Sequence, residues 1–253
     1  FRQGSNLLMN PIAGNSDTFS KAFNSLYTNV RFLSINPPIR SLVVGSAAFG
    51  DGKTTIALNL ALAAAAAGQR VLVVDANLRD PRLHNLIGLS NSAGLSEALI
   101  GSVSPDQVVQ SCAQDKNLFF LSAGQALSDA IRLLASTNMK NLSQELMSRF
   151  DLVIFDSSNL SEFSDTTFLA AQTDGLLITA GVGKTRRTIL TQALAELNRL
   201  QVPVLGMIAN HTARNVAASY AQSSQSQSQE QEQQSILEDL GILKPELPTS
   251  TKR

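Results

Sequence analysis

The sequence predicts an α/β fold, in which a mainly parallel sheet lies between two layers of helices. Six short runs are apolar at successive positions, which is typical of strands that are covered on both faces. Longer stretches of helical character separate most of these runs, and that alternation favours parallel pairing. The runs span residues 42–44, 71–74, 118–121, 152–155, 175–179 and 204–208.

Residues 1–38 form an N-terminal segment ahead of the first predicted strand. This segment is polar except for one helix candidate over residues 16–32, which lies between Pro11 and the pair Pro37 and Pro38. Apolar side chains recur in the candidate at intervals of three and four residues: Phe19, Phe23, Leu26 and Val30. This spacing predicts an amphipathic helix with one buried stripe.

The main domain is expected to span residues 39–221, followed by a flexible tail over residues 222–253. The composition changes abruptly after Ala221, because residues 222–235 contain only Gln, Ser and Glu. Such a tract has no apolar side chains with which to build a core, so we expect it to be disordered. A short apolar patch over residues 236–243 is long enough to dock as one or two helical turns.

The composition excludes several classes of protein. The 20 Lys and Arg residues balance the 20 Asp and Glu residues, so the sequence as a whole is not that of a strongly basic nucleic-acid-binding protein. Cys112 is the one cysteine, which excludes an intramolecular disulfide and fits a reducing compartment. The longest apolar run, residues 60–67, is much shorter than the roughly 20 residues that cross a bilayer.

The strongest motif lies between the first predicted strand and the helix that follows it. Residues 47–55 read Ala-Ala-Phe-Gly-Asp-Gly-Lys-Thr-Thr, which matches the P-loop pattern except that Ala47 replaces the first glycine. The two glycines let backbone N–H groups turn inward and cradle phosphate oxygens at a helix N-terminus. Lys53 supplies a positive charge for the β- and γ-phosphates, and the Thr54 hydroxyl is a Mg²⁺ ligand in this pattern. The motif therefore predicts a three-layer P-loop NTPase fold with a nucleotide site.

Two carboxylates follow buried strands at the edge where ligands bind in open α/β sheets. Asp75 ends one apolar run, and Asp156 ends another that is typical of a Walker B strand, with its carboxylate aimed at Mg²⁺ or at the water shell of the metal. A single acid at such a place is more often a helix N-cap or a turn residue. Two of them together with a P-loop favour a nucleotide site.

Two further features leave their roles open. Lys184, Arg186 and Arg187 begin a predicted helix, where they face phosphate, an acidic partner or solvent. Neither His84 nor His211 stands at metal-ligand spacing from another candidate ligand, so both are expected at the surface or at helix ends.

Taken together, the motifs resemble the cytoplasmic domain of the bacterial tyrosine kinases (BY-kinases) that accompany polysaccharide export. These belong to the deviant-Walker ATPases, relatives of ParA and MinD. The resemblance covers roughly residues 17–214, with the phosphate loop at 46–55 and the second Walker strand at 71–84. Further stretches follow in the family's order: 94–96, 121–124, 151–156, 183–186 and 205–210.

The resemblance implies ATP and Mg²⁺ as ligands and assigns roles to single residues. The ATP contacts, including an Asn placed near the adenine, are Phe49, Gly50, Asp51, Gly52, Lys53, Thr54, Thr55 and Asn210. The Mg²⁺ contacts are Thr54, Asp75 and Asp156. The catalytic positions are Lys53, Asp75, Asn77 and Arg79.

The sequence departs from the family at four places. Asn77 stands where the family has a second acid that holds the metal and assists the attacking tyrosine, so we expect weaker Mg²⁺ binding and less general-base assistance. The family's Thr-Pro-Pro after the Walker B acid is Ser-Ser-Asn at 157–159. Its tyrosine-cluster tail is represented by Tyr220 alone. Its ring-forming Glu, Arg and Arg correspond to Lys21, Asn24 and Tyr27.

Three functions stay open on this basis. The first is an ATP-dependent protein-tyrosine kinase that acts on a partner or weakly on itself. The second is a degenerate kinase whose nucleotide state regulates a polysaccharide co-polymerase with little phosphoryl transfer. The third is a ParA- or MinD-like positioning ATPase, against which Ala48 counts, because that branch has a signature lysine at this position.

The resemblance also implies a place at the cytoplasmic face of the inner membrane. In the family the domain follows a transmembrane helix, and a chain that begins with Phe1 fits a piece of a longer protein. We therefore expect a membrane-spanning polysaccharide co-polymerase region as partner, on the same or a separate chain. A homo-oligomer is a further option, and no nucleic acid partner is expected.

Overall fold

The computed structural model describes residues 16–34, 36–127, 129–161 and 164–211. The described residues up to Asn210 belong to one compact unit, and a second unit begins at His211. Tyr220 and the predicted flexible tail lie outside the described residues. The domain boundaries after residues 38 and 221 therefore stay predictions.

Strands and helices alternate along most of the described chain. The strands are β1 (Ser41–Ser46), β2 (Val71–Asp75), β3 (Val109–Ser111), β4 (Leu118–Leu121), β5 (Leu152–Asn159), β6 (Leu176–Gly181) and β7 (Val204–Asn210). The helices are α1 (Ser16–Leu33), α2 (Lys53–Ala66), α3 (Leu83–Ile87), α4 (Leu95–Ile100), α5 (Pro105–Val108), α6 (Ala130–Leu134), α7 (Thr137–Arg149), α8 (Asp165–Ala170) and α9 (Arg187–Arg199).

Within the described residues the strands form one sheet in the order β3-β4-β2-β5-β1-β6-β7. β3 pairs antiparallel with β4 at one edge, and the other pairs are parallel. The loop after β1 therefore opens at the edge where the neighbouring strands β5 and β6 also end. In the register of β2 and β5, Asp75 stands opposite Asp156, so the two predicted acids meet at this edge.

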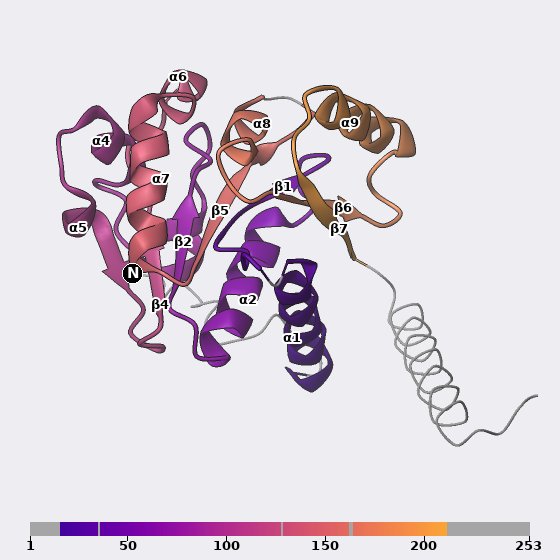
Figure 1. The fold of residues 1–253 in the computed structure, drawn as a ribbon, viewed down its shortest axis with the longest axis horizontal. Helices are drawn as coiled ribbons and strands as arrows, with labels where there is room; N and C mark the ends of the chain where they lie inside the picture. The colour runs from indigo at the N-terminus through magenta and orange to yellow at the C-terminus, as the bar shows by residue number, and fades with distance from the viewer. Residues whose placement is uncertain (1–15, 35, 128, 162–163, 212–253) are drawn as a thin grey trace, which may run out of the picture. The chain divides into compact units, whose positions relative to one another are not determined.

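Helices cover both faces of the sheet (Figure 1). Leu42 and Val44 of β1 belong to one apolar cluster, which includes α1, α2 and α3. Val43 points to the opposite face and belongs to a second cluster, which includes helices α4 to α9. Because both faces are covered, successive apolar residues occur within the central strands, as at 42–44 and 71–74, which explains the continuous runs in the sequence.

The predicted amphipathic helix is α1, which packs beside α2 (Figure 1). Phe23 and Val30 are buried in the first cluster, and Phe19 and Leu26 are partly buried against it. The predicted stripe is therefore confirmed as the contact face of α1.

The predicted three-layer fold is confirmed, and each of the six predicted strands is present. β3 was not predicted, because it has only three residues, none of them buried, and it pairs at an edge. Cys112 is buried and free, as expected for a small core residue. No helix among the described residues has the length and apolar character to cross a membrane.

Candidate functional site

The phosphate loop joins the end of β1 to the first turn of α2, which begins at Lys53. Gly50 and Gly52 have φ angles of 77° and 92°, in the left-handed region that favours glycine. A Cβ atom on Gly52 would lie 2.3 Å from Nδ2 of Asn210. The loop therefore needs glycine for its backbone path, and it leaves the first N–H groups of α2 free for an anion.

Asp51 stabilises the conformation of this loop through hydrogen bonds. Its buried carboxylate accepts a 2.9 Å hydrogen bond from the backbone N–H of Ala48 and a 2.5 Å hydrogen bond from the hydroxyl of Thr185. Its backbone carbonyl accepts a 2.8 Å hydrogen bond from Nδ2 of Asn210. Asp51 and Asn210 thus act as supports of the loop, although the resemblance implied nucleotide contacts for both.

The turn before α9 adds a second support. Nζ of Lys184 donates a 2.8 Å hydrogen bond to the carbonyl oxygen of Gly50. Arg186 is the N-cap of α9, and Arg187 is its first residue, so the predicted basic cluster does begin a helix. The role of Lys184 in the structure is a contact with the phosphate loop.

Asp75 and Asp156 are buried side by side at the ends of β2 and β5. The carboxylate of Asp75 accepts backbone N–H groups from Asn77 at 3.2 Å, Arg82 at 3.2 Å and Leu83 at 3.0 Å. Burial raises the pKa of Asp75 to about 7, with a further rise from the charge of Asp156, against the lowering effect of these hydrogen bonds. Asp75 is thus a capping residue of α3 as well as a candidate metal contact.

Asp156 is the carboxylate with spare capacity for a ligand. Burial raises its pKa to about 6, while the charge of Lys53 and a hydrogen bond from the Thr54 side chain act in the lowering direction. Its Oδ1 is buried and has no hydrogen-bond partner among the described residues. A buried acceptor without a partner is costly unless a ligand satisfies it, so this atom fits a cation or a water held by one.

The other two predicted catalytic residues follow β2. The side-chain amide of Asn77 donates a 2.8 Å hydrogen bond to the carbonyl oxygen of Asp80. The guanidinium of Arg79 binds the buried carboxylate of Asp165, the first residue of α8, through two hydrogen bonds of 2.6 Å and 3.1 Å. This pair raises the pKa of Arg79 and keeps the guanidinium charged at the cavity wall.

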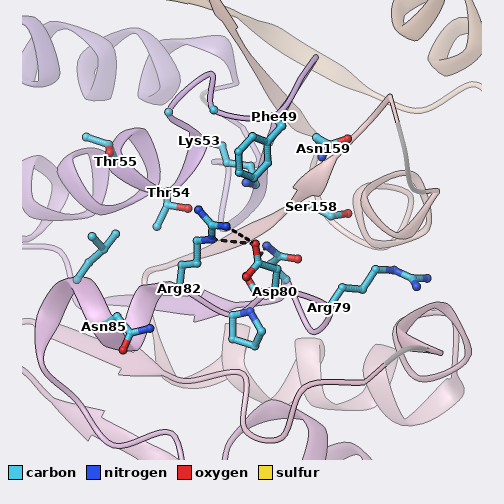
Figure 2. A pocket seen from close by; sticks show the side chains of 15 residues that line it. Phe49, Lys53, Thr54, Thr55, Arg79, Asp80, Arg82, Asn85, Ser158 and Asn159 are labelled. Carbon is cyan, nitrogen blue, oxygen red and sulfur yellow. Dashed lines mark hydrogen bonds and ion pairs between the residues drawn. The ribbon is translucent and has the colours of Figure 1, made fainter.

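These elements enclose a cavity of about 770 Å³ (Figure 2). The phosphate loop forms one wall, and the segment after β2 forms the other. The predicted residues that line it are Phe49, Gly50, Gly52, Lys53, Thr54, Thr55, Asn77 and Arg79. Lining residues that sequence reasoning missed are Asp80, Pro81, Arg82, Asn85, Leu86, Ser158 and Asn159. The lining includes three cations, Lys53, Arg79 and Arg82, of which Arg79 is paired with Asp165 and Arg82 with Asp80. Lys53 and the backbone of the phosphate loop favour an anionic ligand.

The donor set at this cavity suits Mg²⁺ that is shared with a phosphate. The described residues contain no group of three or more His, Cys, Asp or Glu side chains that could hold a metal ion. Mg²⁺ is usually bound by one or two carboxylates together with waters and substrate phosphates. The Thr54 hydroxyl and the free Oδ1 of Asp156 fit that mode of binding.

Residues 42–224 match the model of the CobQ/CobB/MinD/ParA nucleotide binding domain. The Tyrosine-protein kinase YwqD of Bacillus subtilis is 34% identical over 191 residues, which cover 76% of this chain and 80% of that protein. The chain belongs to the bacterial tyrosine kinase branch of this nucleotide-binding family. The resemblance that the sequence motifs indicated is therefore confirmed.

Two further relatives are a longer protein and a kinase domain of known structure. The succinoglycan biosynthesis transport protein ExoP of Rhizobium meliloti is 31% identical over 207 residues, which cover 81% of this chain and 26% of that protein. The solved kinase domain of the Escherichia coli tyrosine kinase ETK superimposes with a TM-score of 0.74 at 25% identity, covering 84% of each chain. The chain thus spans most of YwqD but about a quarter of ExoP.

Proposed function

We propose that the chain binds ATP with Mg²⁺ and transfers the γ-phosphoryl group to a tyrosine hydroxyl. The observation that carries this proposal is the cavity lined by the phosphate loop, whose Thr54 hydrogen-bonds to Asp156, one of the two acids buried at the ends of β2 and β5. The names of its relatives as tyrosine-protein kinases support the choice of acceptor.

In this proposal the phosphate loop binds and orients the nucleotide. The backbone N–H groups of residues 50–55 donate hydrogen bonds to phosphate oxygens, and Lys53 neutralises charge on the β- and γ-phosphates. Mg²⁺, held by Thr54 and Asp156, supplies further charge neutralisation when it is bound. Asp51, Thr185 and Asn210 keep the loop in shape from behind and need no contact with the nucleotide.

The transfer step requires a place for one proton. The tyrosine oxygen forms a bond to the γ-phosphorus, the bond from this phosphorus to the bridging oxygen of ADP breaks, and the tyrosine proton leaves. Asn77 cannot take that proton, because an amide is not a base near neutral pH. Asp75, which lies two positions before Asn77 and whose pKa is raised to about 7, is a carboxylate that can hold it. Its hydrogen bonds to α3 limit its freedom, so we propose a reduced rate of transfer.

A second candidate function is that of a nucleotide-dependent regulator with little phosphoryl transfer. The contact of Asn77 with Asp80 favours it, because the position that carries an acid in the family is here a neutral group that serves the local turn. In either case we propose a membrane-spanning polysaccharide co-polymerase region as the partner, at the cytoplasmic face of the membrane. The name of ExoP, a succinoglycan biosynthesis transport protein, supports this choice.

The deciding experiment measures transfer from γ-labelled ATP with Mg²⁺, using the full chain alone and with a poly(Glu,Tyr) copolymer as acceptor. The kinase function predicts label on tyrosine, in the copolymer or in Tyr27 or Tyr220 of the chain, and none for the Lys53→Met variant. Nucleotide binding without label on any tyrosine would support the regulator and contradict the kinase. A Tyr27→Phe, Tyr220→Phe double variant separates labelling of the chain from labelling of the copolymer.

A further inference from the structure

Arg82 stands on the wall of the cavity that faces the phosphate loop. Its guanidinium carbon lies 5.1 Å from the ring centroid of Phe49, an exposed residue of that loop. The two side chains thus approach each other across the cavity, as Figure 2 shows. The P-loop motif does not include a cation on this wall.

The backbone of Arg82 is fixed, whereas its side chain is half exposed. Its backbone N–H donates to Oδ2 of Asp75 at 3.2 Å, and the next N–H, of Leu83, donates to the same oxygen at 3.0 Å. The buried Asp75 carboxylate therefore fixes the backbone position of Arg82. The guanidinium at its end is free to exchange one anionic partner for another.

The present partner of that guanidinium is Asp80. Nε of Arg82 donates to Oδ2 of Asp80 at 2.8 Å, and a second nitrogen lies 2.6 Å from the same oxygen. The two side chains are 54% and 55% exposed, and ion pairs of this kind contribute little because water screens them. A phosphate group carries more charge and offers oxygens that match the fork of the guanidinium, so it competes well for Arg82.

We propose that Arg82 is a phosphate-contacting residue, which exchanges Asp80 for the terminal phosphate of the nucleotide. Phe49 holds the guanidinium over the phosphate loop through the contact of the cation with its ring. The inference rests on the proposed nucleotide site and adds to it a second cation, opposite Lys53. Because Arg82 meets the outer end of the phosphate chain, it favours ATP over ADP and has no contact with AMP.

The test is calorimetric titration of the full chain with ATP, ADP and AMP in the presence of Mg²⁺. Arg82→Met keeps an unbranched side chain but removes the guanidinium and its charge, and we expect it to weaken ATP binding about tenfold, in the range of a charge-assisted hydrogen bond. ADP binding should fall less, and AMP binding should not change. Arg82→Lys should lie between the parent and Arg82→Met, because it keeps the charge but not the fork. Asp80→Asn should tighten ATP binding roughly twofold to fivefold, since it removes a weak competitor.

The matched control is the pair of Arg199 and Glu196 on α9, which is 67% and 52% exposed and does not line the cavity. Arg199→Met and Glu196→Gln should leave all three affinities unchanged. Equal losses for ATP, ADP and AMP in Arg82→Met, or weaker ATP binding in Asp80→Asn, would overturn the role of Arg82. Unchanged ATP binding in Arg82→Met, with a large loss in Lys53→Met, would overturn it too. If Lys53→Met binds ATP like the parent, the proposed nucleotide site itself is wrong.

Discussion

The hydroxyl of Thr185 donates a 2.5 Å hydrogen bond to the carboxylate of Asp51, across 134 positions of the chain. The same hydroxyl oxygen accepts a 3.0 Å hydrogen bond from the backbone N–H of Gly181 at the end of β6. One threonine thus ties the phosphate loop to the neighbouring strand. The shape of the loop depends on this link as well as on its own glycines.

Thr185→Val should destabilise the chain by about 1–3 kcal/mol, because Oδ1 of the buried Asp51 carboxylate and the Gly181 N–H both lose their hydrogen bond to the Thr185 hydroxyl, while Oδ2 of Asp51 keeps the Ala48 N–H. Urea denaturation measures this loss. Thr191→Val is the control, because Thr191 loses a hydroxyl of the same kind from the exposed surface of α9, where it bonds to the helix backbone. Equal effects of the two substitutions would show that Thr185 does not support the loop.

The buried pair Asp75 and Asp156 predicts a dependence of stability on pH in the absence of Mg²⁺. Their pKa values in the folded chain are raised to about 7 and about 6 from an ordinary value of 3.8, so the folded chain holds protons that the unfolded chain releases. Their contribution is therefore fully present below about pH 4 and is lost as the pH rises to about 7. We expect the free energy of unfolding to fall by roughly 1–3 kcal/mol between pH 5 and 7.

Denaturation in a buffer with a chelator checks this slope, and Asp156→Asn should flatten it. The substitution removes one of the two carboxylates that titrate in this range. Two results would contradict the pairing of the two acids. One is the same dependence on pH in the variant as in the parent, and the other is a free energy of unfolding that rises with pH in the parent.

Restoring the acid with Asn77→Asp should raise phosphoryl transfer. The new carboxylate adds charge beside the Mg²⁺ site and an acceptor for the tyrosine proton, and general-base assistance is typically worth ~10²–10⁴-fold. The apo chain should lose some stability, because the variant lacks the donor to the Asp80 carbonyl and repels Asp75. Asn85→Asp is the control, since it adds the same charge to the cavity wall at a place in α3 and not directly after β2. A flat rate in Asn77→Asp would show that Asn77 does not limit the enzyme.

The sequence was enough to predict the fold and the phosphate-loop side of the cavity. The strands β1 and β2 are recognisable because both of their faces are buried, and the loop is recognisable because its glycines and Lys53 have fixed spacing. β3 has neither signal: it is short, polar in part and lies at an edge.

Of the opposite wall only Asn77 and Arg79 were predicted, because tertiary contacts build the rest. Arg79 and Asp165 are 86 positions apart, and no periodic pattern connects them. Arg82 lines the cavity because its backbone N–H is bound by the Asp75 carboxylate at the start of α3. In the sequence, Asp75 is visible only as an acid at the end of a strand. The residues of this wall nevertheless follow the acid of β2 directly, which is the signal that could have found them.

The central claim is that the chain binds ATP through the phosphate loop, and calorimetric titration of the parent and of Lys53→Met with ATP and Mg²⁺ tests it most directly. Lys53 is the cation that the loop places against the phosphates, a charge-assisted contact typically worth about 1.5–3 kcal/mol. We expect saturable binding of one ATP by the parent and a loss of at least about tenfold in affinity in the variant. Equal affinities for ATP in the two proteins would contradict the claim.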